Sequence, residues 1–215
     1  MNLNIEYKLF NNLSLPDNEA LTSLHMALLP HSPVVLLGRK FMEKFYYQEL
    51  PRQNLMRGVV VYLNEKPIGF IASTNDSAGF MKKAIIKKYI YLLYILAISV
   101  ITDPHRILAI WEALQIMLKL PNTACNEKVG ELLSLGVLPE YQSGKFQRIN
   151  GVNISKELVC MSVNDLREWG CDVIRVVVDE DNTPAKFFYH AMGWELTNNK
   201  LKGWRVPSVE FSITL

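Results

Sequence analysis

The chain has few cysteines, almost no excess charge of either sign and no recognisable leader. Its 215 residues include three cysteines, Cys125, Cys160 and Cys171, whose number and spacing match neither a disulfide framework nor a zinc site. We therefore expect reduced thiols and a cytoplasmic location. A formal charge of +2 is too small to indicate a nucleic-acid partner. The first ten residues lack a basic stretch followed by an apolar one, so we expect no signal peptide.

Several kinds of functional sequence are also missing. The most apolar run, YIYLLYILAISVI at 89–101, has 13 residues, short of the roughly 20 needed to cross a bilayer. Stable membrane insertion is therefore not expected. We find no phosphate-binding P-loop, no Ser/His/Asp order and no cluster of metal ligands. These absences argue against a nucleotide hydrolase, a serine hydrolase and a metalloenzyme.

What is present is the composition of an ordinary globular protein, with 49% hydrophobic and 20% charged residues. This length suits one sizeable core, so we expect a single domain over residues 1–215. Apolar periodicity predicts helices at 19–29 and 36–50 and a hairpin of strands at 58–63 and 67–74. His25 lies on the apolar stripe of the first helix, where a core or boundary histidine is expected.

The stretch from Glu131 to Trp194 organises the rest of the chain. It predicts a strand at 131–138, a loop that begins at Pro139 and is polar over 141–153, a helix, and a strand at 171–179 that is apolar on both faces. A loop that opens a helix offers unpaired backbone N–H groups to an anion such as phosphate. Alternatively, the glycines of this loop only turn the chain.

Two motifs in this stretch resemble those of the GNAT N-acetyltransferases. VLPEY at 137–141, followed by RINGVN at 148–153, resembles the acetyl-CoA loop V-x-P-x-x-(Q/R)-x-x-G-x-(G/A). The six residues QSGKFQ between them are either an insertion or shift the match onto Gln142. Asn153 replaces the last small residue of the motif. NTPAKFFYHAMGW at 182–194 is similar to the closing motif N-x-x-A-x-x-(F/L)-Y-x-x-x-G-F.

The resemblance implies an α/β (α+β) fold with a mixed, mostly antiparallel central sheet flanked by helices. It also implies acetyl-CoA as cosubstrate and direct transfer of the acetyl group to a primary amine, most simply on a small molecule. The residues that it assigns to acetyl-CoA binding are Gly136, Val137, Leu138, Arg148, Asn150, Gly151, Val152, Asn153, Ser155, Asn182, Ala185 and Phe188.

The resemblance further implies catalytic groups. A backbone N–H of Gly136, Val137 or Leu138 would bind the thioester carbonyl, and Tyr189 would protonate the departing thiolate. Tyr189 could instead be a packed helix residue beside Phe187 and Phe188. Glu131 stands where some members have a catalytic base, although a water chain or His31, expected near the acceptor pocket, could take the same proton. No metal is implied.

A segment at about 78–121 has no counterpart in the family pattern. Four lysines precede its apolar run, and a second helical stripe covers 107–118. We expect an extra helical insertion, buried in the core or forming a homodimer contact; alternatively, its basic end beside an apolar helix docks on an anionic membrane or a partner. A second hypothesis follows: the domain is a catalytically weak GNAT-like binding or regulatory module that acts through these helices.

Overall fold

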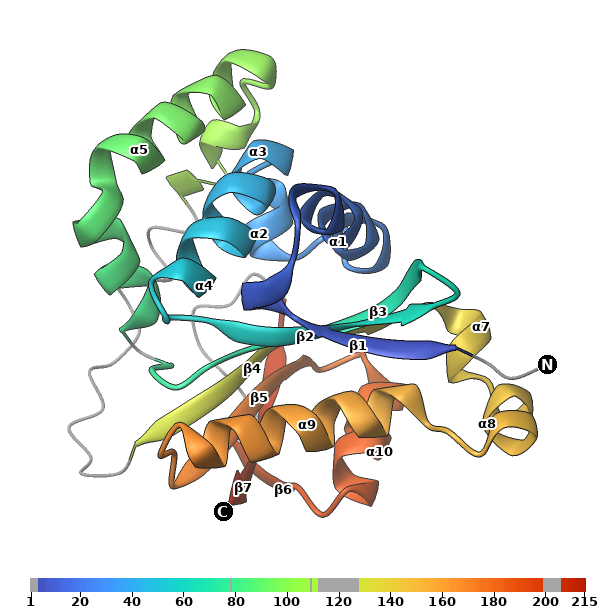
Figure 1. Ribbon diagram of the computed structural model, residues 1–215. Helices are drawn as coiled ribbons and strands as arrows, with labels where there is room; N and C mark the ends of the chain where they lie inside the picture. The colour runs from blue at the N-terminus through green and yellow to red at the C-terminus, as the bar shows by residue number, and fades with distance from the viewer. Residues whose placement is uncertain (1–3, 78, 109, 112–127, 199–205) are drawn as a thin grey trace.

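The computed structural model describes residues 4–77, 79–108, 110–111, 128–198 and 206–215. In these residues seven strands form one mixed sheet in the order β1-β2-β3-β4-β5-β7-β6 (Figure 1). Only β4 and β5 pair in parallel, and every other neighbouring pair is antiparallel. The predicted mixed, mostly antiparallel sheet is confirmed. The strands are β1 (Ile5–Leu9), β2 (Arg57–Leu63), β3 (Lys66–Thr74), β4 (Val129–Val137), β5 (Val173–Asp179), β6 (Glu195–Asn198) and β7 (Ser208–Thr214).

Helices cover both faces of the sheet, each over its own buried cluster (Figure 1). On one face lie the N-terminal helices and the long insertion helix: α1 (Leu15–Leu28), α2 (Pro33–Leu36), α3 (Arg39–Phe41), the π-helix η2 (Met42–Glu49), α4 (Leu50–Arg52) and α5 (Phe80–Thr102). The other face carries α9 (Ile154–Glu168) and α10 (Thr183–Ala191). A short 3-10 helix, η1 (Phe10–Asn12), joins β1 to α1.

Local sequence explains where several elements begin and turn. Ser14 and Asp17 form a reciprocal capping box at the start of α1. Asn64 and Glu65 both have positive φ, as the two-residue turn between β2 and β3 requires, and the predicted hairpin is confirmed. The predicted helix at 36–50 is confirmed from Arg39 onward, where α3, η2 and α4 follow one another without a break, but its predicted start at Leu36 is wrong. Gly38, with φ of +101°, separates α2 from α3, because the left-handed backbone conformation cannot continue a right-handed helix.

The predicted polar loop at 141–153 is also wrong, since it folds into α7 (Pro139–Gln142) and α8 (Gly144–Asn150). The Ser143 side chain caps α8 by accepting from the Phe146 N–H. The rings of Tyr141 and Phe146 meet edge to face at 5.3 Å. The stretch QSGKFQ thus ends α7 at Gln142 and, after the capping residue Ser143, begins α8.

The insertion helix α5 differs from the expected core helix. It bends at Lys88, and its buried residues are limited to Ala84, Leu92, Ile95 and Ser99. By length and composition alone it could cross a membrane, and it is the one helix of this kind in the described chain. The second predicted stripe, 107–118, lies mostly outside the described residues.

Candidate active site

The sheet opens between β4 and β5. The two strands pair only from Val129–Leu132 to Val173–Val176, whereas β3 pairs along β4 as far as Val137. Along β4 the opening toward β5 begins at Leu133. The same residue is a bulge in the pairing of β4 with β3, since Ala72 pairs with Ser134 and Ser73 pairs with Leu132. A bulge of this kind bends a strand and turns its groups away from regular pairing. The second half of β4 therefore has one unpaired edge.

Alternation of the hydrogen bonds decides which amides face this opening. The Leu138 N–H donates to the Ile68 carbonyl at 2.8 Å and so points toward β3. In an antiparallel ladder the N–H of Gly136 then points the same way, and those of Val137 and Leu135 point away from β3. Of the three amides predicted to face the thioester, only Val137 faces the opening. Leu135 was missed because its direction depends on the strand register.

The junction between α8 and α9 lies just beyond the end of β4. Gly151 has φ of +68° and ends α8, with its N–H donating to the Gln147 carbonyl at 2.8 Å. Asn153 begins α9, and its side chain turns back to accept from the Lys156 N–H at 3.1 Å. The first N–H groups of α9, on Ile154 and Ser155, have no acceptor within the helix. Of the predicted residues, Asn150 lies inside α8 and the Gly151 N–H is bonded to Gln147, so the backbone donors at this junction lie nearer to the predicted Ser155.

Arg148 lies on the exposed side of α8, where its Nε donates to the Gly144 carbonyl. The Gln142 side chain donates to the Val137 carbonyl at 2.5 Å, which ties α7 to the end of β4. A Cβ built at Gly151 meets nothing within 4 Å, so the space beside the α8–α9 junction is open. This open junction, with its free amides, can accept an anionic group.

Helix α10 carries the closing motif. Asn182 caps it by accepting from the Ala185 N–H at 3.1 Å. Tyr189 is buried, 3% exposed, with its ring 5.2 Å from that of Phe188 and 5.3 Å from that of Trp194. Burial raises the pKa of the Tyr189 hydroxyl well above its usual value. Tyr189 and Val137 belong to one buried cluster, whereas Phe187 is exposed and does not pack there.

Glu131 lies at the closed end of the opening. Its Oε2 accepts from Nε and Nη2 of Arg175, at 3.0 and 2.9 Å, and from the Ser77 hydroxyl at 2.5 Å. Arg175 also pairs with Glu210 on β7. Glu131 precedes Val137 by six positions, which is roughly 20 Å along an extended strand. A base must lie within a hydrogen bond or one water of its proton, so this ion pair instead joins β4, β5 and β7.

The two N-terminal histidines have different surroundings. His31 is exposed in the turn before α2, whereas His25 is completely buried on α1. The His25 ring stacks on Phe70 with centroids 4.8 Å apart, and its Nδ1 lies 2.5 Å from the Tyr47 hydroxyl. The interpretation of His25 as a core residue agrees with this burial.

We expect His25 to make stability depend on pH. Burial lowers the pKa of His25 to about 4, so the folded protein holds it neutral while the unfolded chain protonates it near its ordinary value. The contribution of neutral His25 to the free energy of unfolding is complete above about pH 6.5. It is lost as the pH falls toward 4, by at most about 1.4 kcal/mol per pH unit. Urea unfolding at several pH values should show a shallower dependence for His25→Gln. An identical dependence in both proteins would contradict this expectation.

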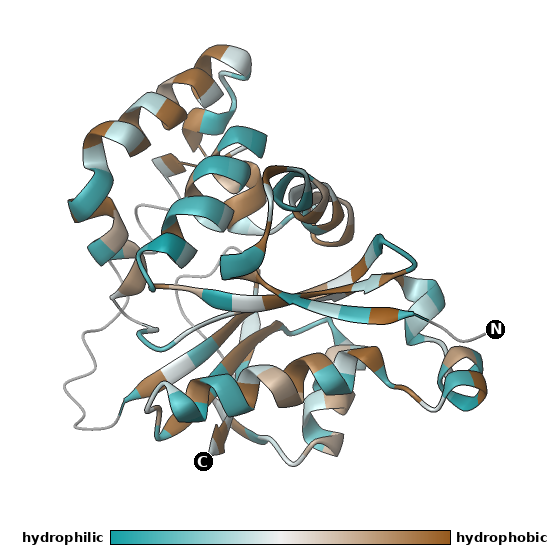
Figure 2. Ribbon diagram, viewed as in Figure 1, coloured by the Kyte–Doolittle hydropathy of each residue, from teal (hydrophilic) through white to brown (hydrophobic). Residues whose placement is uncertain are grey.

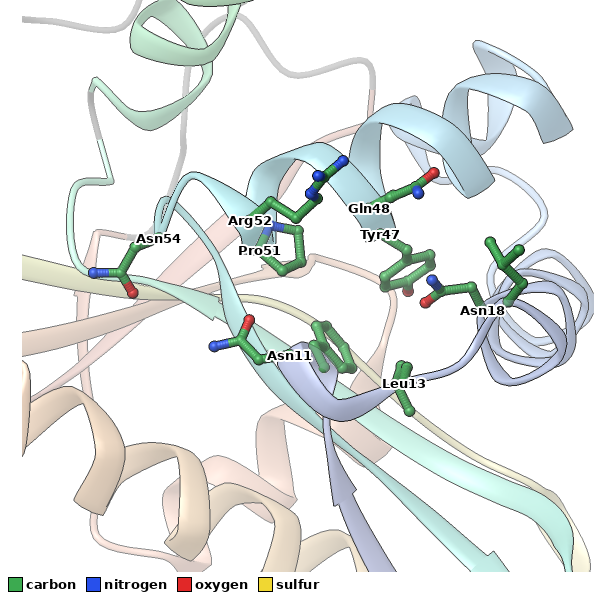
Figure 3. Close-up of a pocket in the computed structure, with 10 residues that line it drawn as sticks. Asn11, Leu13, Asn18, Tyr47, Gln48, Pro51, Arg52 and Asn54 are labelled. Carbon is green, nitrogen blue, oxygen red and sulfur yellow. The ribbon is translucent and has the colours of Figure 1, made fainter.

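A cavity of about 590 Å³ lies away from the opening, among η1, the start of α1, η2 and α4 (Figure 3). It contains none of the predicted site residues. Asn18 and Tyr47 lie beside each other at this cavity, and the Asn18 Oδ1 is buried without a hydrogen-bond partner in the described part of the chain. Its lining residues are Phe10, Asn11, Leu13, Leu15, Asn18, Tyr47, Gln48, Pro51, Arg52 and Asn54.

Solved structures share this fold. PaiA N-acetyltransferase from Thermoplasma acidophilum, in complex with coenzyme A, matches with a TM-score of 0.54 and 15% identity over 98% of this chain and 99% of that chain. NAA60 from Arabidopsis thaliana, in complex with acetyl-CoA, matches with a TM-score of 0.58 and 14% identity over 98% of each chain. At these identities the likeness establishes the fold.

Sequence comparisons add the family. Mycothiol acetyltransferase from Thermobifida fusca is 32% identical over 81 residues, which cover 38% of this chain but only 23% of that enzyme. The sequence model described as "Acetyltransferase (GNAT) family" matches residues 21–194, most of the chain and both motif regions. The open strand pair, the α8–α9 junction and the closing motif lie within or at the edge of this range, and the chain belongs to the GNAT acetyltransferase family.

Proposed function

We propose that this protein transfers the acetyl group of acetyl-CoA directly to a primary amine, in a single domain. The observation that carries the proposal is the opening between β4 and β5, where the Val137 and Leu135 amides face a space without a strand partner. Preorganised N–H groups of this kind stabilise the negative charge that develops on a thioester oxygen during attack. The acceptor that we favour is a small-molecule amine.

The pyrophosphate of acetyl-CoA would bind at the α8–α9 junction. Its donors would be the N–H groups of Val152, Asn153, Ile154 and Ser155, aided by the positive end of the α9 dipole. Asn153 fits this role because its side chain bonds to the first turn of α9 and so leaves the backbone accessible. On the other side, Asn182 and Ala185 lie at the start of α10 and Phe188 lies further along it, and the thiol end of the cosubstrate would pass beside them.

The reaction needs two proton movements. The neutral amine attacks the carbonyl carbon, a C–N bond forms, and the C–S bond breaks to release the CoA thiolate. Tyr189 would donate its phenolic proton to that sulfur, and water in the opening would take the proton that the amine loses. Since Glu131 is held by Arg175 at the closed end, we assign it a structural part in this scheme rather than that of the base.

Acetyl-CoA binding can be tested by thermal unfolding. A ligand present at about 100 times its dissociation constant adds roughly 2.7 kcal/mol of stability, so the melting temperature should rise by several degrees. Gly151→Asp should weaken binding by about tenfold or more, because a carboxylate would stand beside the phosphates. Gly151→Asn is the matched control, since asparagine has the same shape, carries no charge and tolerates positive φ. Equal affinity in both variants would contradict the proposed phosphate position.

The second candidate is a binding module, favoured by the unusual exposure of α5. A protein that shows no thermal shift with millimolar acetyl-CoA, and no thiol release with any amine in a screen, would support the module over the enzyme. A thermal shift together with thiol release would exclude it. The amine that gives the fastest release would identify the acceptor class.

A further inference from the structure

Helix α5 presents an unusual outward surface. Ile86, Ile90, Leu93 and Ile101 recur at helical spacing, and their exposed fractions run from 62% to 80%. Tyr89 and Tyr94 are exposed beside them. Figure 2 shows that the part of α5 beyond its lysines is largely hydrophobic and forms the outer edge of its layer. This apolar stripe has residues on both sides of the bend at Lys88, and an exposed stripe of this kind on a folded domain usually marks an interaction surface.

The first two turns of the same helix are basic. Lys82, Lys83, Lys87 and Lys88 lie around Ile86 at the start of the apolar stripe, and 80–102 contains no carboxylate. Lys83 pairs with Asp76 at 2.7 Å and Lys88 lies 3.8 Å from Glu49. Among the residues that the structure describes, Lys82 and Lys87 have no carboxylate within ion-pair distance. Two cations are thus left for an external anion.

Lysines and tyrosines also surround a shallow hollow at the bend. It has a volume of about 480 Å³ and is lined by Lys87, Lys88, Tyr89, Ile90, Tyr91 and Tyr94. Aromatic rings with one polar end favour the boundary between lipid headgroups and acyl chains. Lysine side chains can place their stems along apolar surface while the ammonium group meets phosphate.

The other face of α5 is tied to the domain. Leu92 and Ile95 are buried in the core cluster, and the Ser99 hydroxyl donates to the Leu37 carbonyl at 2.6 Å. The Arg106 Nη1 donates to the same hydroxyl. Crossing a bilayer would require the loss of these contacts and the burial of Lys87 and Lys88 in hydrocarbon. The helix can therefore meet a membrane only along its exposed side.

We propose that α5 docks this protein on the surface of an anionic phospholipid bilayer. The helix lies parallel to the membrane, with Lys82 and Lys87 on lipid phosphates and the stripe of Ile86, Ile90 and Leu93 in the interfacial region. A basic, aromatic and apolar helix face is the combination that binds such surfaces. A second copy of the chain fits less well, because its own α5 offers four more lysines and no carboxylate.

Flotation of the purified full chain with vesicles tests this proposal. Vesicles of three parts phosphatidylcholine and one part phosphatidylglycerol should bind the protein at least about tenfold more tightly than phosphatidylcholine alone, and salt should weaken the binding. Lys82→Glu with Lys87→Glu should lower the affinity by about tenfold or more, since about 1 kcal/mol is expected for each basic residue near the surface.

Further variants separate charge from apolar contact. Ile90→Ser with Leu93→Ser should also abolish most of the binding, without changing the melting temperature, because both side chains are exposed. Lys66→Glu with Arg167→Glu makes the same charge change away from α5 and should leave binding intact.

Three results would overturn the proposal. The first is equal binding to both kinds of vesicle, and the second is vesicle binding that neither α5 variant lowers. The third is that the protein binds no vesicle and forms a dimer, which the serine variant alone dissociates.

Discussion

Replacing Tyr189 by phenylalanine should lower turnover by roughly 100-fold or more while acetyl-CoA affinity changes by no more than a few-fold, the pattern of a lost proton donor. The variant keeps the ring that contacts Phe188, Trp194 and Phe211, so the buried cluster should remain intact. Burial favours the protonated phenol, and the same low-polarity surroundings raise the proton affinity of a CoA thiolate leaving beside it. The two shifts have opposite effects on the proton transfer, so the pKa difference between the phenol and the thiol stays close to its value in water.

The measurement is single-turnover thiol release with the best amine from the acceptor screen, so that chemistry rather than product release limits the rate. Phe211→Leu serves as the control, because it alters a ring beside Tyr189 but removes no hydroxyl. Full turnover in Tyr189→Phe would assign Tyr189 to packing alone and leave the thiolate to be protonated by water.

Replacing Arg175 by methionine should destabilise the fold by about 3 kcal/mol, because Glu131 would be left as an unpaired charge in a buried position. The Glu131 side chain is only 9% exposed, and Glu210, the other carboxylate that Arg175 meets, would lose its partner too. Methionine retains most of the volume and apolar contact of the arginine stem. The loss of unfolding free energy would therefore reflect the broken charge pair rather than a cavity.

Urea unfolding of four proteins isolates this effect: the wild type, Arg175→Met, Glu131→Gln and the double variant. The double variant should recover much of the loss, since no ionised Glu131 remains to be compensated. Arg39→Met provides a comparison, because its bond with Glu43 is a more exposed i,i+4 pair expected to contribute about 0.3–0.5 kcal/mol. Similar losses in Arg175→Met and Arg39→Met would contradict a buried structural pair.

The family and the main elements of the fold could be predicted from short stretches of sequence. The capping side chains of Asn153 and Asn182 bond to amides three residues later, and the β2–β3 turn needs only Asn64 and Glu65. Such interactions are local, so the chain carries them wherever the rest of the protein lies. The closing motif is local in the same sense, since all of its residues lie between Asn182 and Trp194, and it could therefore be matched to the family pattern from sequence.

Other predictions failed because neighbouring elements outweighed local pattern. The apolar run of α5 suggested a core helix, yet only one of its sides meets the N-terminal helices. The polar stretch before Asn153 suggested a loop, but Ser143 and the Tyr141–Phe146 contact stabilise helices there. Hydropathy records how apolar a segment is, and it does not record how many surfaces are available to cover it.

By itself, the sequence determined the family, the order of strands and helices along most of the chain, and the place of Tyr189 in its motif. Only the tertiary structure decided that the Val137 and Leu135 amides face the opening, that Glu131 pairs with Arg175, and that α5 keeps an apolar side uncovered. Amide direction follows from strand register and a bulge, and ion pairing follows from the contact of distant strands. These depend on partners far away in the chain, which no local pattern of residues can specify.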